Sequence, residues 1–185
     1  MAKVILCSAS PRRRELLGSV LADFEIRKTD AEEKSRYLRP HLRVMDLALA
    51  KQANVAAEKD DVVISSDTLV YLGGKYYGKP LTAQRAAEML RELSGKTHSV
   101  YTGVAVRRGE KTVLFYDKAE VVFRTLSEED IRRYIKVYSP LDKAGAYGVQ
   151  DGVVVKRYAG SYSCIMGLPM EKLSQVLKEM GVKNV

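Results

Sequence analysis

Two serines, a proline and three arginines stand together near the start of the chain, in the stretch SASPRRR at residues 8–14. The apolar run VILC precedes them, and Pro11 suits the first position of a helix, where its missing N–H costs nothing. A helix N-terminus already carries partial positive charge, so clustered arginines there favour a bound anion. With the hydroxyls of Ser8 and Ser10 and the forked guanidinium of Arg12, the stretch predicts a phosphate site; an ordinary helix cap beside solvated arginines is the alternative.

Asp67 is the second candidate, in the stretch VVISSDTLV at residues 62–70. The run 62–66 is largely apolar, as in strands buried on both faces, and we expect Asp67 to lie immediately beyond its end. Ligands of open α/β sheets bind at the carboxyl ends of strands, where a carboxylate can hold a metal ion or take a proton from water. An aspartate that only forms a turn or caps a helix is the alternative.

Two weaker signals come later in the chain. Lys79 precedes a proline in YGKP, which keeps its backbone extended and favours a projecting ammonium group, although an ordinary solvated lysine fits the same pattern. Residues 139–152 form a glycine-rich stretch between ordered elements, and long loops in compact domains are commonly functional. Its Gln150 offers a donor and an acceptor that suit the edge of a nucleotide base; a glutamine facing water on a structural loop is the open alternative.

Metal binding would depend on carboxylates. Glu32 and Glu33 are adjacent in a connecting segment, where such pairs usually face solvent. If the fold brings one of them to Asp67, a carboxylate pair facing a lysine and arginine cluster would hold Mg²⁺ against a triphosphate. The two histidines, His41 and His98, have no partner at metal-ligand spacing, so zinc is not expected and we interpret His98 as a structural residue in a turn.

The elements that must position these residues alternate between strand-like and helix-like patterns. Strands are expected at 3–7, 24–28, 62–66, 99–106, 112–124 and 153–158, with a hairpin at 69–77 that turns through Gly73 and Gly74. Helices are expected at 11–21 after Ser10, at 42–59, at 82–93, from a cap at Ser127 to 137, and at 170–180. This alternation predicts one α/β domain over residues 1–185 with a mixed sheet.

Composition limits the class of protein. The 185 residues, 46% of them hydrophobic and 29% charged, are ordinary for a globular protein. A net charge of +8 and a pI near 9.4 permit either nucleic-acid binding or a site for a small polyanion. The basic residues are dispersed, tryptophan is absent and aromatic content is 8%, which disfavours a nucleic-acid surface. Two cysteines and the lack of an apolar run of ~20 residues predict a cytoplasmic protein with no membrane span.

The motifs occur together in an order that resembles the Maf nucleotide pyrophosphatases. The order is SxSPRR, a glutamate near residue 33, LALAKQ, SSDT, GKP, LSGxxHxVxTG, DKAGAYGxQ and finally GLP, from Val4 to about Pro169. Each motif alone is weak, whereas their fixed order over nearly the whole chain is specific. The resemblance implies an elongated α/β body with a long mixed sheet flanked by helices and a central cleft, similar to inosine triphosphatases and commonly dimeric.

The activity that this resemblance implies is hydrolysis of a nucleoside triphosphate between its α- and β-phosphates, which yields the monophosphate and pyrophosphate. By position, Asp67 would be the proton acceptor that activates water. Glu33 and Asp67 would hold a divalent metal ion, expected to be Mg²⁺ with Mn²⁺ as an alternative. The residues that would bind the phosphates are Ser8, Ser10, Arg12 (with Arg13 as an alternative), Lys51 and Lys79.

The resemblance also implies a choice of base. Arg13, Thr68 and Gln150 match the positions that select the base in the branch marked by KAGAYGxQ, which prefers dTTP and UTP. A sister branch that acts on 7-methyl-GTP departs from this stretch and is kept as one alternative. A nucleic-acid-binding or cell-division regulatory module without catalysis, suggested by the basic pI, is the other. We therefore expect a house-cleaning dTTP/UTP pyrophosphatase that forms a homodimer and binds neither nucleic acid nor membranes.

The chain departs from the family pattern at two positions. Arg14 adds a third arginine to the usual pair, and we interpret it as a solvated surface charge. Asp151 stands where the family often has glycine. Because Asp151 is next to Gln150, we expect that it can alter base preference.

Overall fold

The computed structural model describes residues 3–29, 34–53, 55–183 and 185. Within these residues the chain forms a seven-stranded mixed sheet in the order β2-β1-β3-β5-β6-β7, with β4 paired to the far end of β3. The strands are β1 (Val4–Cys7), β2 (Glu25–Ile26), β3 (Val62–Leu72), β4 (Lys75–Tyr77), β5 (Thr97–Arg108), β6 (Lys111–Phe123) and β7 (Val155–Ala159). β1 runs parallel to β2 and β3, and the remaining pairs are antiparallel. The predicted α/β class with a mixed sheet is therefore confirmed.

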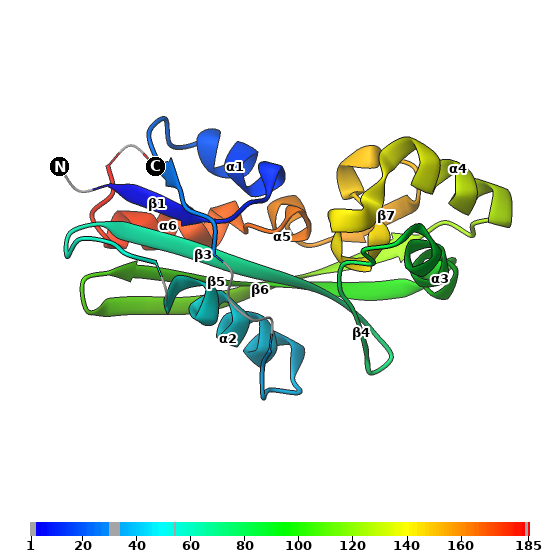
Figure 1. The fold of residues 1–185 in the computed structure, drawn as a ribbon, viewed down its shortest axis with the longest axis horizontal. Helices are drawn as coiled ribbons and strands as arrows, with labels where there is room; N and C mark the ends of the chain where they lie inside the picture. The colour runs from blue at the N-terminus through cyan, green and yellow to red at the C-terminus, as the bar shows by residue number, and fades with distance from the viewer. Residues whose placement is uncertain (1–2, 30–33, 54, 184) are drawn as a thin grey trace.

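Helices cover both faces of the sheet (Figure 1). They are α1 (Pro11–Gly18), α2 (Pro40–Ala53), α3 (Ala83–Leu93), α4 (Glu128–Tyr138), α5 (Tyr162–Met166) and α6 (Met170–Glu179). The long strands β3, β5 and β6 run through the length of an elongated body, with α1 and α6 towards one end and α3 and α4 at the other (Figure 1). Among the described residues, no helix combines the length and apolar character that crossing a membrane requires.

Two hydrophobic clusters lie along the same face of the sheet. The first core consists of Leu6, Leu17, Val62, Ile64, Val104, Val106, Leu168, Leu173, Leu177 and Met180. The second core consists of Val70, Tyr77, Ala86, Met89, Leu90, Leu93, Val100, Val121, Phe123, Ile131, Tyr134, Ala146, Tyr147 and Val154. Alternate residues of a strand share a face, so Ser66 and Thr68 lie on β3 between Ile64 of the first core and Val70 of the second. The sheet face therefore carries a polar band between its two cores.

Strand β3 is longer than the sequence predicts. The expected strand ends at Ser66, whereas β3 continues to Leu72. The polar residues 65–68 stay in the strand because β5 pairs with them along their whole length and because their side chains find partners. The expectation that Asp67 lies beyond a strand end is wrong: Asp67 is inside β3, next to the end of β1.

Other predicted elements differ mainly at their ends. The hairpin through Gly73 and Gly74 and the capping box at Ser127 are confirmed. Helix α2 ends at Ala53 rather than at residue 59. Residues 58–61 form a turn instead, in which Asp61 accepts a hydrogen bond from the backbone N–H of Glu58. Helix α1 ends at Gly18 rather than at residue 21, and helix α5 was not predicted.

Candidate active site

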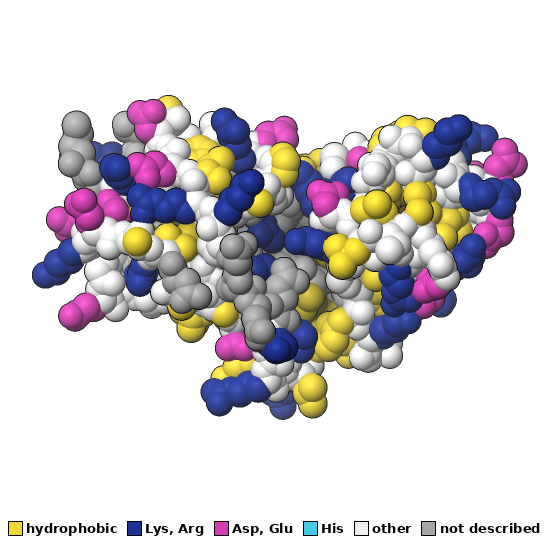
Figure 2. Space-filling model, viewed as in Figure 1, with side chains coloured by type: hydrophobic (Ala, Val, Ile, Leu, Met, Phe, Trp, Pro, Cys, Tyr) yellow, Lys and Arg dark blue, Asp and Glu magenta, His cyan; other side chains and the backbone are white. Residues whose placement is uncertain are grey.

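The edge of β3 that faces away from β5 pairs with two different strands, β1 and β4. β1 pairs with it as far as Ser65, and β4 pairs with it from Val70 onwards. Between them, residues 66–69 have no strand partner on this edge within the described chain. A cavity of about 470 Å³ opens at this gap, a size typical of small-molecule sites. Lys and Arg side chains surround the hollow between the two halves of the molecule (Figure 2).

On one face of β3, Asp67 points towards α2. Its ammonium partner is Lys51, which comes from the last turn of α2. The Asp67 side chain is 8% exposed and the Lys51 side chain 16%, so the ion pair is largely withdrawn from water while both residues line the cavity. The predicted base and one predicted phosphate-binding residue therefore lie together.

Close approach of α2 to the sheet makes this ion pair possible. Gly103 on β5 is the cross-strand partner of Asp67. A Cβ atom at Gly103 would lie 2.4 Å from the carbonyl carbon of Val44 in α2, so no side chain fits there. The absence of a side chain lets α2 cross directly over β5 and brings Lys51 within reach of β3.

On the other face of β3, the guanidinium of Arg13 is held by three acceptors. Its Nε donates to the carbonyl of Gly167 at 2.9 Å, its Nη1 to the carbonyl of Ser66 at 2.8 Å, and its Nη2 to Oγ1 of Thr68 at 3.1 Å. The Thr68 hydroxyl is also 2.9 Å from that of Thr102. Arg13 is thus fixed as a cation in the cavity wall, and Thr68 is oriented by two polar neighbours.

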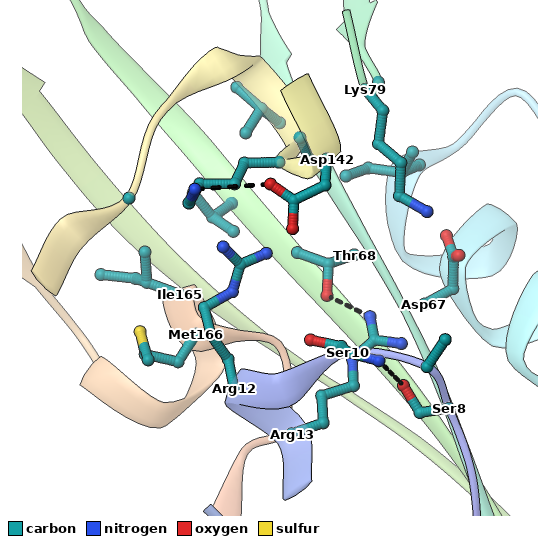
Figure 3. Close-up of a pocket in the computed structure, with 18 of the residues that line it drawn as sticks. Ser8, Ser10, Arg12, Arg13, Asp67, Thr68, Lys79, Asp142, Ile165 and Met166 are labelled. Carbon is teal, nitrogen blue, oxygen red and sulfur yellow. Dashed lines mark hydrogen bonds and ion pairs between the residues drawn. The ribbon is translucent and has the colours of Figure 1, made fainter. Parts of the chain in front are cut away.

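Gly167 anchors this arrangement and ends α5. Its φ of 102° is in the region that glycine adopts without strain, and a Cβ there would lie 3.1 Å from both Arg13 Nε and Thr68 Oγ1. The signals for α5 were present in the sequence, since Ser161 caps its start and Gly167 its end. These signals predict a short helix that ends at Met166, and Met166 lines the cavity beside Arg12 (Figure 3).

The stretch 8–14 divides between the cavity and solvent. Ser8 is buried, and its Oγ accepts a hydrogen bond of 3.1 Å from the backbone N–H of Ser10. Ser10 is the N-cap of α1 by position, but its side chain makes no capping hydrogen bond, contrary to an ordinary cap. Ser8, Ser10, Arg12 and Arg13 line the cavity, whereas Arg14 is exposed and does not, in agreement with its interpretation as a surface charge.

Lys79 and the stretch 139–152 form the opposite wall. Lys79 is exposed and extends towards Asp67 (Figure 3). The loop that carries it is tied to the second stretch by a hydrogen bond of 3.1 Å from Gly145 N–H to the carbonyl of Gly78. The glycine-rich stretch folds into three short 3₁₀ turns, and the last of them, Val149–Asp151, places Gln150 at the cavity.

The predicted metal ligands are only partly described. Glu33 and its neighbour Glu32 lie outside the described residues. Within the described part of the chain, no group of three or more His, Cys, Asp or Glu side chains could hold a metal ion. Asp67 offers a carboxylate at the cavity, and Mg²⁺ commonly binds through one or two carboxylates together with substrate phosphates. The donor chemistry therefore fits a divalent cation that binds with the substrate.

Several cavity residues were not predicted as site residues. Arg43 from α2 places its guanidinium 5.1 Å from the ring centroid of Tyr76. Lys143 and Tyr147 come from the glycine-rich stretch. The positions of these side chains depend on packing between distant elements, so the linear pattern carried no specific signal for Arg43 or Tyr76.

Two residues have structural roles. His98 lies within β5 rather than in a turn, is 2% exposed, and hydrogen-bonds the hydroxyl of Tyr147 at 2.9 Å through Nε2. Burial lowers the pKa of His98 to about 4. Cys7 is buried at the end of β1, and burial raises the pKa of its thiol to about 11, so it packs as a small hydrophobic residue.

The mixed sheet and the cavity at the gap in β3 define an α/β protein with a site for a small polyanionic ligand.

The fold is similar to that of a HAM1 protein from Coxiella burnetii, with a TM-score of 0.50 and 17% identity over 97% of this chain and 100% of that one. The model of the Maf-like protein family matches residues 3–180. The chain belongs to this family, as its motifs predict. It is 45% identical to proteins from Bacillus cereus strains Q1 and B4264 that are named dTTP/UTP pyrophosphatase, over 98% of this chain and 97% of each relative.

Proposed function

We propose that this protein hydrolyses dTTP and UTP to the monophosphate and pyrophosphate. The observation that carries the proposal is Asp67, a carboxylate that pairs with Lys51 and lines one cavity with the cations Lys79 and Arg12 at the unpaired edge of β3. A triphosphate needs such cations, and its hydrolysis needs a base for water. The name of the two Bacillus cereus relatives gives the same substrates, and their 45% identity over nearly the full chain supports transfer of that activity.

Each side chain then has a step to perform. Without substrate, Lys51 pairs with Asp67. When a triphosphate binds, we expect Lys51 to turn to a phosphate oxygen, which leaves Asp67 to accept a proton from the attacking water. Arg12 and Lys79 would neutralise charge that develops on the phosphate oxygens, and Ser8 and Ser10 would donate hydrogen bonds to them. The side chains of Asp67 and Lys51 are largely withdrawn from water, which strengthens electrostatic contacts at that point of the cavity.

A divalent cation, Mg²⁺ or Mn²⁺, would be held by Asp67 and by Glu33, which lies outside the described residues. Its chemical contribution would be to neutralise and orient the phosphate oxygens. The test measures the affinity for Mn²⁺ by electron paramagnetic resonance in the presence of a non-hydrolysable dTTP analogue. Wild type should bind Mn²⁺ at least ~10-fold more tightly than Asp67→Asn, and equal affinity would exclude Asp67 as a ligand.

Base selection is proposed for Arg13, Thr68 and Gln150. Arg13 and Thr68 are already hydrogen-bonded to each other, so they would present a fixed surface to the base. Gln150 is exposed at the cavity and can donate and accept. The stretch KAGAYGVQ favours pyrimidine nucleotides over the 7-methyl-GTP alternative, in line with the names of the relatives.

A nucleotide panel tests the proposal. Purified protein with Mg²⁺ should convert dTTP and UTP to monophosphate and pyrophosphate, with kcat/KM above that for dCTP, dGTP and 7-methyl-GTP. Release of phosphate and a diphosphate would exclude cleavage between the α- and β-phosphates. No hydrolysis of any nucleotide, together with binding to nucleic acid, would support the non-catalytic alternative.

We further propose a homodimer located in the cytoplasm. Both cysteines, Cys7 and Cys164, are free and buried, which fits a reducing compartment. Light scattering at micromolar concentration should give twice the monomer mass of 20.7 kDa, and a monomer at all concentrations would contradict the dimer.

A further inference from the structure

The hydroxyl of Tyr134 contacts both ends of the last 3₁₀ turn, at Gly148 just before it and at Asp151, its final residue. Tyr134 lies in α4, is 1% exposed and belongs to the second core. Its oxygen accepts a hydrogen bond of 2.9 Å from the backbone N–H of Gly148 and donates one to Oδ2 of Asp151. These two partners stand on either side of Gln150 in the chain, so a single hydroxyl fixes both ends of the segment that carries Gln150.

Gly148 provides the space in which the Gln150 side chain rests. A Cβ atom at Gly148 would lie 2.7 Å from Nε2 and 2.8 Å from Oε1 of Gln150, and 2.8 Å from Oδ2 of Asp151. The amide of Gln150 and the carboxylate of Asp151 therefore both lie against the bare backbone of Gly148. Since Gln150 lines the cavity, this contact sets where its amide meets a ligand.

We infer that Tyr134 and Asp151 form a clamp that positions Gln150 for discrimination among nucleotide bases. This inference rests on the proposed function, since it concerns the specificity of that same site. Neither residue belongs to the predicted phosphate or metal machinery, and Tyr134 does not line the cavity.

The polarity of the clamp is fixed. Burial, and then the hydrogen bond to Asp151, raise the pKa of Tyr134, so its hydroxyl remains protonated and always donates to the carboxylate. The oxygen of the same hydroxyl accepts the hydrogen bond from Gly148 N–H. The ring of Tyr134 stacks on that of Tyr138 with centroids 4.9 Å apart. Removal of the hydroxyl alone would release the turn without removing the ring from the core.

The test compares Tyr134→Phe, Asp151→Ala and Asp151→Asn by steady-state kinetics on dTTP, UTP and dGTP. Loss of a hydrogen bond at the clamp should lower the ratio of kcat/KM for dTTP to that for dGTP by ~5-fold in the first two variants, mainly through KM for dTTP. Asp151→Asn keeps an oxygen that can accept from Tyr134 and should retain the wild-type ratio within about 2-fold. This rescue separates positioning from a general loss of structure.

Tyr77→Phe is the matched control. Tyr77 is also buried in the second core and donates its hydroxyl to a carboxylate, that of Glu92 at 2.7 Å, but does not line the cavity. Its variant should keep the wild-type nucleotide ratio. If Tyr134→Phe also keeps the ratio, or loses activity equally on all three nucleotides, the positioning role is wrong.

Amide hydrogen exchange keeps the clamp testable if the proposed function fails. The Gly148 amide should exchange ~5-fold faster in Tyr134→Phe than in wild type, and at the wild-type rate in Tyr77→Phe. A wild type that hydrolyses no nucleotide would contradict the proposed function alone. Unchanged Gly148 exchange in Tyr134→Phe would contradict the clamp, whatever the activity.

Discussion

The two cores differ in the chemistry of their side chains. The buried members of the first core are aliphatic residues and one methionine, whereas the second core contains the aromatic residues Tyr77, Phe123, Tyr134 and Tyr147. Aliphatic burial stabilises a fold without specifying direction, because the hydrophobic effect depends on area. A buried tyrosine adds a hydroxyl that must find a partner in a defined direction. The first core therefore supplies a frame, and the second also positions individual loops through hydrogen bonds.

The polar band between the cores belongs to neither. Ser66 donates to the carbonyl of Gly167 at 3.1 Å, and Thr102 donates to the carbonyl of Cys164 at 2.8 Å. These bonds satisfy groups that would otherwise interrupt an apolar sheet face. Arg13 joins this band through Thr68, and the ion pair of Asp67 and Lys51 lies at the same level of β3 on its opposite face. The comparison predicts that reaction chemistry depends on Asp67 at the middle of β3, while the contribution of Gln150 to the choice of base depends on a loop held by the second core.

The largest expected effect is that of Asp67→Asn. Loss of the base should lower kcat by ~10²–10⁴-fold on every nucleotide that wild type hydrolyses, because the reaction at the phosphates is common to all of them. Single-turnover assays of dTTP and UTP hydrolysis measure this. Retention of more than ~10% of activity would contradict the role of Asp67 as proton acceptor.

Asp61→Asn is the matched control for that substitution. Asp61 is a buried carboxylate just before β3, and hydrogen bonds from the backbone N–H groups of Lys3 and Glu58 lower its pKa. Its variant should lose some resistance to urea but keep the kcat of the folded enzyme. A comparable loss of kcat in both variants would point to a structural cause.

A second, smaller effect concerns the stability of the second core in acid. Burial lowers the pKa of His98 to about 4 against an ordinary 6.5, and the nearby Glu120 opposes this only in part. The unfolded chain therefore binds a proton that the folded chain does not between these values. Stability should fall as pH drops from 6.5 to about 4, by about 1.4 kcal/mol per pH unit at most, with no further contribution below that window.

Urea unfolding between pH 6.5 and about 4 measures the contribution of His98 to stability. The measurement compares wild type with His98→Asn and His41→Asn. His98→Asn should flatten the pH dependence, and His41→Asn should retain it. Hydrogen exchange near pH 4.5 should increase around Phe123 and Tyr147, whose rings pack on His98, before it increases around Ile64. Simultaneous loss of protection in both cores would show that they unfold as one unit and would weaken the comparison.

Local rules account for most of the elements that could be predicted from the sequence. Strand β1, the hairpin at Gly73 and Gly74, and the capping box of α4 depend on neighbours within a few residues, and the structure has all three. Extension of β3 through Ser65–Thr68 could not be predicted this way. Those polar residues remain in the strand because of partners such as the carbonyls of Ala48 and Gly167, which are distant in sequence.

The candidate site shows the same division. Asp67, Arg12 and Gln150 could be singled out because their residue types stand in motifs, and the structure brings all three to one cavity. Tyr134 could not, because its function arises from a helix packing against a loop 14 residues away in sequence. A tyrosine in an amphipathic helix is predicted to be a core residue. Only the structure shows that its hydroxyl hydrogen-bonds to Gly148 and Asp151.

A still smaller effect, and the one that most directly tests the second half of the comparison, is that of Gln150→Ala. Loss of the amide should lower kcat/KM for dTTP and UTP by ~10-fold while changing that for dGTP by less than ~3-fold, because only the matched base forms hydrogen bonds with it. Gln84→Ala on the exposed side of α3 is the control and should leave all ratios unchanged. Competition assays with paired nucleotides measure the ratios directly. A uniform loss across the panel would show that Gln150 supports the loop rather than reads the base, and the second core would then position structure without selecting substrate.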